Sequence, residues 1–177
     1  MKSSQKVKNM AMAALLAAVT GVLSQVIIPL GPVPFTMAVF GVFFMGMMLS
    51  PRYALASILV YILLGLVGVP VFAGFSAGPA VLAGPTGGYV VGYIAMAVMP
   101  AFARAKKLPA WAVLAAAVVG LIICYALGTV WFMLLTQNSL AVSLAWCVFP
   151  FVVPDIAKAF LALALARVLE RRMVHMS

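Results

Sequence analysis

Three long stretches of this chain contain no charged residue, and they constrain its fold more than any other feature. They are residues 9–51, 53–103 and 108–154, with lengths of 43, 51 and 47 residues. A helix needs about 20 apolar residues to cross a hydrocarbon core about 30 Å thick. Each stretch is therefore long enough for two membrane crossings with a turn between them.

The composition agrees with a chain that is solvated by lipid. Of its 177 residues, 67% are hydrophobic and only 7% are charged, whereas a soluble domain has about 25% charged residues. This difference excludes a soluble globular domain. At this length we expect a single transmembrane domain that covers residues 1–177.

Each uncharged stretch contains one interruption that suits a turn. Pro29, Pro32 and Pro34 interrupt the first, because proline removes a backbone donor and disfavours helix before it. The second is interrupted over 65–88, which holds seven of the 14 glycines, and the third by the polar run 136–139. We therefore predict an all-α integral membrane protein with six transmembrane helices. Their approximate spans are 10–29, 35–49, 53–67, 88–103, 109–135 and 146–170.

The basic residues orient this predicted bundle. Ten of the eleven lie at alternate helix ends: Lys2, Lys6, Lys8, Arg52, Arg104, Lys106, Lys107, Arg167, Arg171 and Arg172. The loops 29–35, 65–88 and 136–145 carry no charge. The positive-inside rule then predicts a multi-pass protein of the cell membrane with both termini in the cytoplasm. We therefore interpret the net charge of +9 as a feature that orients the protein in a membrane with anionic lipid. No nucleic acid partner is expected.

Two charged residues, Asp155 and Lys158, lie inside the sixth apolar segment. A charge near the bilayer centre costs about 2.5–3.5 kcal/mol on insertion scales, so such residues are candidates for function. Their i, i+3 spacing places both on one helix face, where they can pair or share a ligand. Pro154 suits a first helical turn, which predicts a helix start or a kink before Asp155. The alternative is an ion pair that only fixes helix packing.

The uncharged loop at 65–88 supplies a second part of a candidate site. Loops of this length often bind ligands, and glycine allows close approach of the backbone. Gly87 and Gly88 directly precede a predicted helix and could present free N–H groups, while Tyr89 and Tyr93 share a face as flat walls. The full set of candidates here is Phe75, Ser76, Gly87, Gly88, Tyr89 and Tyr93. Thr36 adds a hydroxyl to the site or caps the second helix. The pattern favours a small ligand with a polar head, bound near the outer surface.

The first predicted helix carries small residues four positions apart, including Ala14 and Ala18. Small residues let helices approach closely in lipid. Packing within the bundle and docking to a partner membrane protein both remain open.

Enzymatic chemistry has little support in the sequence. The only acids are Asp155 and Glu170, and no phosphate-binding G-x-x-x-x-G-K-[ST] loop is present. Cys124 and Cys147 have neither metal-ligand nor disulfide spacing. We therefore expect no enzyme activity, no metal site and no cofactor.

Four segments in order carry a family resemblance: Gly31–Thr36, Gly65–Gly74, Gly84–Tyr89 and Pro154–Lys158. Together they resemble the BioY family, the biotin-specific substrate-binding (S) components of energy-coupling factor (ECF) transporters. The similarity covers nearly the whole chain. It implies a six-helix S-component fold, biotin as the transported ligand, and partnership with a transmembrane coupling (T) protein and two cytoplasmic ATPases.

The resemblance also implies roles for single residues. Asp155 and Lys158 match the polar ligand contacts of the family, Thr36 and the Gly84–Tyr89 loop match its capping elements, and Ala14 with Ala18 matches its docking surface. Asp155 can accept hydrogen bonds from the ureido N–H groups of biotin. Lys158 can donate to the ureido carbonyl or to the carboxylate, and the sequence leaves these two partners open. Alternatives are an S component for thiamine or riboflavin, a channel, or an intramembrane enzyme with Asp155 and Lys158 as acid and base.

Overall fold

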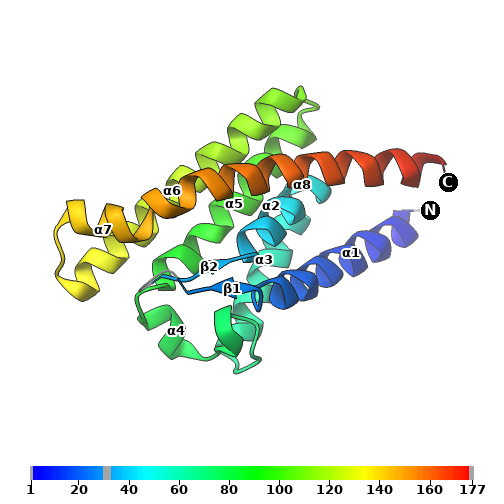
Figure 1. Cartoon of the computed structure of the whole chain (residues 1–177). Helices are drawn as coiled ribbons and strands as arrows, with labels where there is room; N and C mark the ends of the chain where they lie inside the picture. Colours follow the sequence, from blue (N-terminus) through cyan, green and yellow to red (C-terminus); the bar gives the residue numbers. More distant parts are fainter. Residues whose placement is uncertain (1, 30–32, 176–177) are drawn as a thin grey trace.

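The structure of the protein is a computed structural model that describes residues 2–29 and 33–175. Its long helices are α1 (Lys2–Leu23), α2 (Ala38–Met48), α3 (Pro51–Leu66), α5 (Gly87–Ala105), α6 (Ala110–Thr136) and α8 (Phe149–His175). Its short elements are β1 (Ile27–Ile28), β2 (Phe35–Thr36), η1 (Ala73–Phe75), α4 (Pro79–Ala83) and α7 (Leu140–Cys147). Figure 1 shows the start of α1 and the end of α8 at the same end of the bundle, with α7 at the opposite end.

Each of the six predicted segments contains a helix, but the helices differ in length. Within residues 2–29 and 33–175, four helices are long and apolar enough to cross a membrane, namely α1, α5, α6 and α8. The apolar helices α2 and α3 have only 11 and 16 residues. At a rise of about 1.5 Å per residue they are shorter than the hydrocarbon core. The structure thus supports a helical membrane protein, and the count of six crossings remains a prediction.

Helices α5 and α6 form a hairpin that packs backbone against backbone. Glycines make this close approach possible: a Cβ added to Gly92 would lie 2.6 Å from the Cα of Cys124, and one added to Gly120 would lie 2.9 Å from the Cα of Met96. Small residues at helix contacts are typical of membrane proteins, where dispersion between closely packed helices stabilises the bundle. The hairpin provides a rigid wall for the rest of the molecule.

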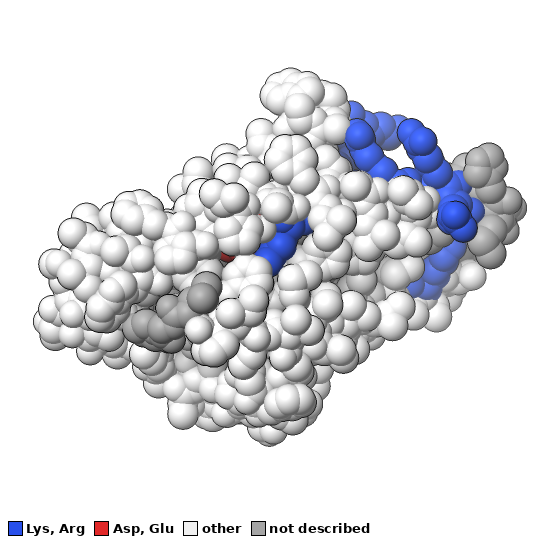
Figure 2. All heavy atoms as spheres, viewed as in Figure 1, with Lys and Arg blue, Asp and Glu red and all other residues white. Residues whose placement is uncertain are grey.

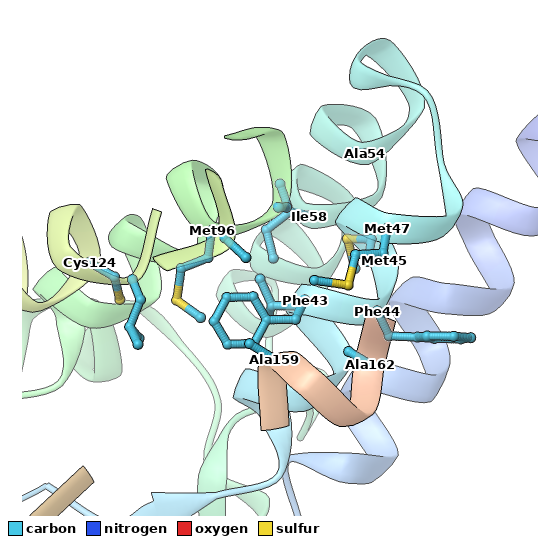
Figure 3. Close-up of a cluster of buried hydrophobic side chains, with 14 of the residues drawn as sticks. Phe43, Phe44, Met45, Met47, Ala54, Ile58, Met96, Cys124, Ala159 and Ala162 are labelled. Atoms are coloured by element: carbon cyan, nitrogen blue, oxygen red, sulfur yellow. The ribbon is translucent and has the colours of Figure 1, made fainter. Parts of the chain in front are cut away.

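Helix α2 lies at the centre of the hydrophobic core. Its residues Val42, Phe43, Met45 and Met47 are fully buried, in contact with helices α5 and α8. Figure 3 shows Phe43, Met45 and Met47 in one cluster with side chains of three other helices, namely Met96 of α5, Ile58 of α3, and Ala159 and Ala162 of α8. The alanines of α8 lie close to α2 because they leave room for its bulky side chains. In contrast, many large apolar side chains of α1, α3, α6 and α8 are exposed on the outer surface of the bundle, as lipid contact requires.

The structure corrects several expected boundaries, since α1 already begins at Lys2 and not at 10, and α2 begins at Ala38 and not at 35. Helix α1 ends at Leu23 and not at 29, because Ile27 and Ile28 leave the helix and pair antiparallel with β2. The predicted loop 136–145 is largely helical and contains most of α7. Helix α8 begins at Phe149, so Pro154 lies inside it and is not the helix start. The break after Thr136 is confirmed, since Gln137 adopts the left-handed conformation that ends α6.

The charged side chains gather at one end of the molecule. Figure 2 shows Lys and Arg concentrated at the end where the two chain ends lie, while the rest of that face is nearly uncharged. One small spot of positive charge with a trace of negative charge appears in the middle of the face, at the bottom of a depression. Some charge therefore lies inside the bundle, away from the basic end.

Candidate ligand-binding site

The centre of the candidate site is an ion pair on α8. The Nζ atom of Lys158 lies 2.8 Å from Oδ1 of Asp155, and the two residues are 5% and 3% exposed. Their i, i+3 spacing brings both side chains to the same face of the helix, as the sequence predicted. Among the described residues, this pair therefore holds the only buried charges of the bundle.

Two other elements complete the contacts of the pair. The hydroxyl of Tyr125, on α6, donates a hydrogen bond of 2.7 Å to Oδ2 of Asp155. Lys158 donates a 2.7 Å hydrogen bond to the backbone carbonyl of Thr36, on β2, and its Nζ lies 3.6 Å from the ring centroid of Phe35. The ring compensates part of the desolvation of the ammonium by a cation–π interaction. Helix α6, helix α8 and strand β2 thus meet at this pair.

Neither charged group has used its full bonding capacity. A carboxylate has about four acceptor positions and an ammonium has three donors. Asp155 uses two acceptor positions, on Lys158 and Tyr125, and Lys158 uses two donors, on Asp155 and Thr36. Asp155 therefore keeps about two acceptor positions and Lys158 keeps one donor for further polar partners.

The short hairpin of β1 and β2 explains the position of Phe35 and Thr36. Ile27 pairs with Thr36 and Ile28 with Phe35, so the chain after α1 turns back across the bundle. The ring of Phe35 then stacks on Phe151, with 6.5 Å between centroids and 13° between planes. Because Phe151 lies one turn before Asp155 on α8, this stacking sets the hairpin over the ion pair.

Two adjoining cavities lie beside the pair. The smaller, of about 40 Å³, is lined by Asp155 and Lys158 together with Thr36, Tyr93 and Tyr125. The larger, of about 130 Å³, shares Thr36 and Tyr93 with it and extends toward the 65–88 loop. Aromatic rings thus line part of both cavities, and the ion pair forms the polar end of the smaller one. An ion pair that only fixed helix packing would not need such a space.

Gln25, two residues after the end of α1, and Trp131 of α6 hold the loop that closes the larger cavity. The amide of Gln25 donates to the carbonyls of Pro70 and Phe72 at 3.3 and 3.2 Å, and its oxygen accepts from the N–H of Phe75 at 2.7 Å. Trp131 of α6 donates to the carbonyl of Gly84 at 3.0 Å. The loop is therefore attached to the bundle near both of its ends.

The buried ring of Phe72 also anchors this loop. It packs on Gly65, where a Cβ would lie only 2.1 Å from the ring, and meets Tyr61 edge to face at 5.6 Å. Only glycine at position 65 leaves room for the ring. One of the glycines in the matching segment Gly65–Gly74 thus has a packing role.

The predicted site residues fall into two groups. Those that line one or both cavities are Thr36, Ser76, Tyr89, Tyr93, Asp155 and Lys158. Phe75 is 69% exposed, and neither it nor Gly87 or Gly88 lines these cavities. Of the matching segment Gly31–Thr36, Gly31 and Pro32 lie outside the described residues.

Gly87 and Gly88 are the first two residues of α5, and their contacts differ from the expected ones. The N–H of Gly87 donates to the carbonyl of Gly84, so the expectation of a free donor is wrong for Gly87. Gly88 packs on α6, where a Cβ would lie 2.7 Å from the carbonyl oxygen of Leu127. Both glycines serve close packing in this structure. Thr36 is not the cap of α2, since Met37 occupies that position, and its contact with Lys158 is through the backbone carbonyl.

The alanines of α1 divide between two faces. Ala13 and Ala17 are buried, and the carbonyl of Ala13 accepts a hydrogen bond of 2.6 Å from Ser57 of α3. Ala14 and Ala18 are exposed on the outer surface of the bundle. Packing within the bundle therefore uses Ala13 and Ala17, and the docking role of Ala14 and Ala18 remains a prediction.

Sequence reasoning missed three residues of the site. Tyr125 and Phe35 are aromatic residues within apolar stretches, and nothing in the sequence connects either of them to Asp155 or Lys158. Gln25 had a usable signal, because it is a polar side chain directly before the first predicted turn.

Comparison with known proteins identifies the family. The model of the BioY family matches residues 1–175. The chain is 38% identical over 165 residues to a probable biotin transporter BioY of Pyrococcus horikoshii, covering 93% of this chain and 98% of the relative. It is 34% identical over 174 residues to the biotin transporter BioY2 of Lactococcus lactis, covering 96% and 94%.

A solved structure agrees over nearly the full length. The crystal structure of the S-component for biotin from an ECF-type ABC transporter superposes with a TM-score of 0.89 at 28% identity. The match covers 97% of this chain and 95% of that one. This chain therefore belongs to the BioY family.

Proposed function

We propose that this protein binds biotin at the Asp155–Lys158 site and carries it across the cell membrane as the substrate-specific subunit of an ECF-type ABC transporter. Membership of the BioY family and the similarity to an S-component for biotin support this function. The observation that carries it is the Asp155–Lys158 ion pair beside a cavity, because these are the only buried charged side chains among the described residues. Intramembrane charges that face a cavity are typical of substrate pathways.

The free bonding capacity of the pair suits the head of biotin. The remaining acceptor positions of Asp155 can take the ureido N–H groups, and the third donor of Lys158 can reach the ureido carbonyl or the carboxylate. The rings of Tyr89 and Tyr93 offer flat apolar surfaces for the bicyclic ring and its sulfur. Tyr125 acts here as a positioning residue, since its hydroxyl orients the carboxylate of Asp155.

Binding requires the site to widen. The two cavities measure about 40 and 130 Å³, and pockets for small organic molecules begin at about 300 Å³. The side chains of Thr36, Tyr89 and Tyr93 line both cavities. Movement of these side chains, together with the loop that Gln25 and Trp131 fasten, would join the two spaces into one.

The transport mechanism we propose depends on partner proteins. The sequence has no phosphate-binding loop, so ATP would be hydrolysed by two cytoplasmic ATPases linked through a T protein. The exposed face with Ala14 and Ala18 is our candidate for docking to the T protein. We also propose six membrane crossings, with both termini and the basic end in the cytoplasm.

The decisive experiment identifies the ligand. We expect mass spectrometry of the purified protein to detect bound biotin, and titration calorimetry to give one biotin per chain. Thiamine and riboflavin, tested in the same way, should not bind. If either of these vitamins binds and biotin does not, the ligand assignment is wrong; if nothing binds in a folded sample, the transport function itself fails.

A further inference from the structure

A separate cavity, of about 280 Å³, lies at the basic end of the molecule, away from the Asp155–Lys158 pair. It forms where α5 ends, α6 begins and α8 passes both. Its charged lining residues are Arg104, Lys107, Arg167 and Glu170, and its apolar lining includes Val113 and Leu163. The proposed function uses none of these residues.

The charges in this cavity are unbalanced. Arg104 donates to the carbonyl of Met47 and pairs with Glu170, so its guanidinium is held in place and the one local carboxylate is engaged. The only other acid of the chain, Asp155, pairs with Lys158. Within the described residues, Lys107 and Arg167 therefore have no acidic partner, and the cavity carries a net charge of about +2.

Part of the lining of the cavity is apolar, and the residues around it are typical of the headgroup level of a membrane. Val113 and Leu163 are buried, whereas Leu108 is exposed at the rim and continues the apolar surface outward. Trp111, near the start of α6, is 73% exposed. Tryptophan on the outer surface of a membrane helix collects at the headgroup level.

We propose that this cavity binds the phosphate of an anionic phospholipid. Two free cations and a fixed guanidinium supply charge-assisted donors for a phosphodiester, and the apolar wall suits the glycerol and the first acyl carbons. Basic pockets between membrane helices on the cytoplasmic side recognise such headgroups. A bound lipid would connect the ends of α5, α6 and α8.

Thermal unfolding of the delipidated full-length protein tests this site. In an uncharged detergent, we expect dioleoylphosphatidylglycerol to raise the Tm and dioleoylphosphatidylcholine to leave it unchanged. Lys107→Asn and Arg167→Gln should each raise the half-saturating concentration of the anionic lipid about five-fold. Asn is chosen because Lys107 has a φ of 54°, which Asn tolerates. Glu170→Gln should lower that concentration, because it removes the competing carboxylate.

Controls separate this site from other sources of the same effect. Arg52→Gln removes an exposed cation outside the cavity and should leave the lipid response unchanged. An equal loss in Arg52→Gln, or equal Tm shifts from the two lipids, would overturn the site. Stabilisation by glycerol 3-phosphate at the same concentration would show a site for free phosphate and reject the lipid. The lipid assignment is also rejected if Lys107→Asn and Arg167→Gln leave the lipid response intact but impair transport with partners, which would indicate a protein contact.

Discussion

At the scale of single residues, the Asp155–Lys158 pair carries the proposed function. Removal of one charge leaves the other buried without its ionic partner, and charge-assisted hydrogen bonds contribute about 1.5–3 kcal/mol or more. We expect Asp155→Asn and Lys158→Ala each to raise the Kd for biotin more than about 30-fold in calorimetry. Arg171→Gln, an exposed cation farther along α8, is the matched control and should bind normally. Unchanged affinity in either site variant would reject the assigned role.

Tyr125 should act on biotin only through Asp155. Tyr125→Phe keeps the ring and removes the hydroxyl that donates to Oδ2. A hydrogen bond to a charged group contributes about 1.5–3 kcal/mol, so we expect biotin affinity to fall by roughly 10-fold or more. In the background of Asp155→Asn the same substitution should have much less effect, because the carboxylate is already absent. Full additivity of the two losses would contradict a positioning role; Tyr53→Phe, outside both cavities, serves as control.

The site residues that the sequence predicts best are the two charged ones, because charged side chains are unusual in an apolar segment. Asp155 and Lys158 could be predicted because charges inside an apolar membrane segment are costly. The carbonyl of Thr36 could not be predicted as a lysine contact, since every residue has a carbonyl and only the β1–β2 pairing directs this one. Tyr125 lies 30 residues before its partner on another helix, and only the tertiary packing connects them.

At the scale of elements, one glutamine makes several of the hydrogen bonds that hold the 65–88 loop on the bundle. Gln25→Ala removes its three hydrogen bonds to the loop. We expect faster hydrogen exchange of the backbone amides at 71–76 with unchanged exchange in α5 and α6, and faster dissociation of biotin. Gln5→Ala is a matched control, because Gln5 is exposed on α1 and bonds only to Asn9. Equal exchange in Gln25→Ala and the wild type would show that Phe72 and Trp131 hold the loop without the hydrogen bonds of Gln25.

Long helices were predictable, and short elements were not. Uncharged stretches with proline, glycine or polar interruptions located a helix in all six segments. The two-residue strands are too short to produce a period of two in the sequence. Helix α7 is apolar and lies between α6 and α8 within the same uncharged stretch, so its end at Cys147 had no compositional marker. The turn between α7 and α8 depends on Val148, whose backbone angles (φ −127°, ψ −61°) are not helical.

At the scale of the whole molecule, the separation of charge predicts one orientation in the membrane. Basic residues gather at the end that holds both termini (Figure 2), and this end should face the cytoplasm. We expect a green fluorescent protein fusion at either terminus to fluoresce and an alkaline phosphatase fusion at either terminus to be inactive. Phosphatase inserted after Asn138, between α6 and α7, should be active. Opposite results for the two termini would exclude an even number of crossings.

The small volume of the two cavities predicts a binding reaction with two steps. If the site must widen before or after biotin enters, the observed rate in stopped-flow fluorescence will level off as biotin concentration rises. Trp131 can report this change, because its indole donates to Gly84 at the end of the loop. Trp131→Phe should abolish the signal while calorimetry still detects binding. A rate that increases linearly to high biotin concentration would instead mean that the ligand enters in one step. In that case the side chains of Thr36, Tyr89 and Tyr93 would have to move at least as fast as biotin associates with the protein.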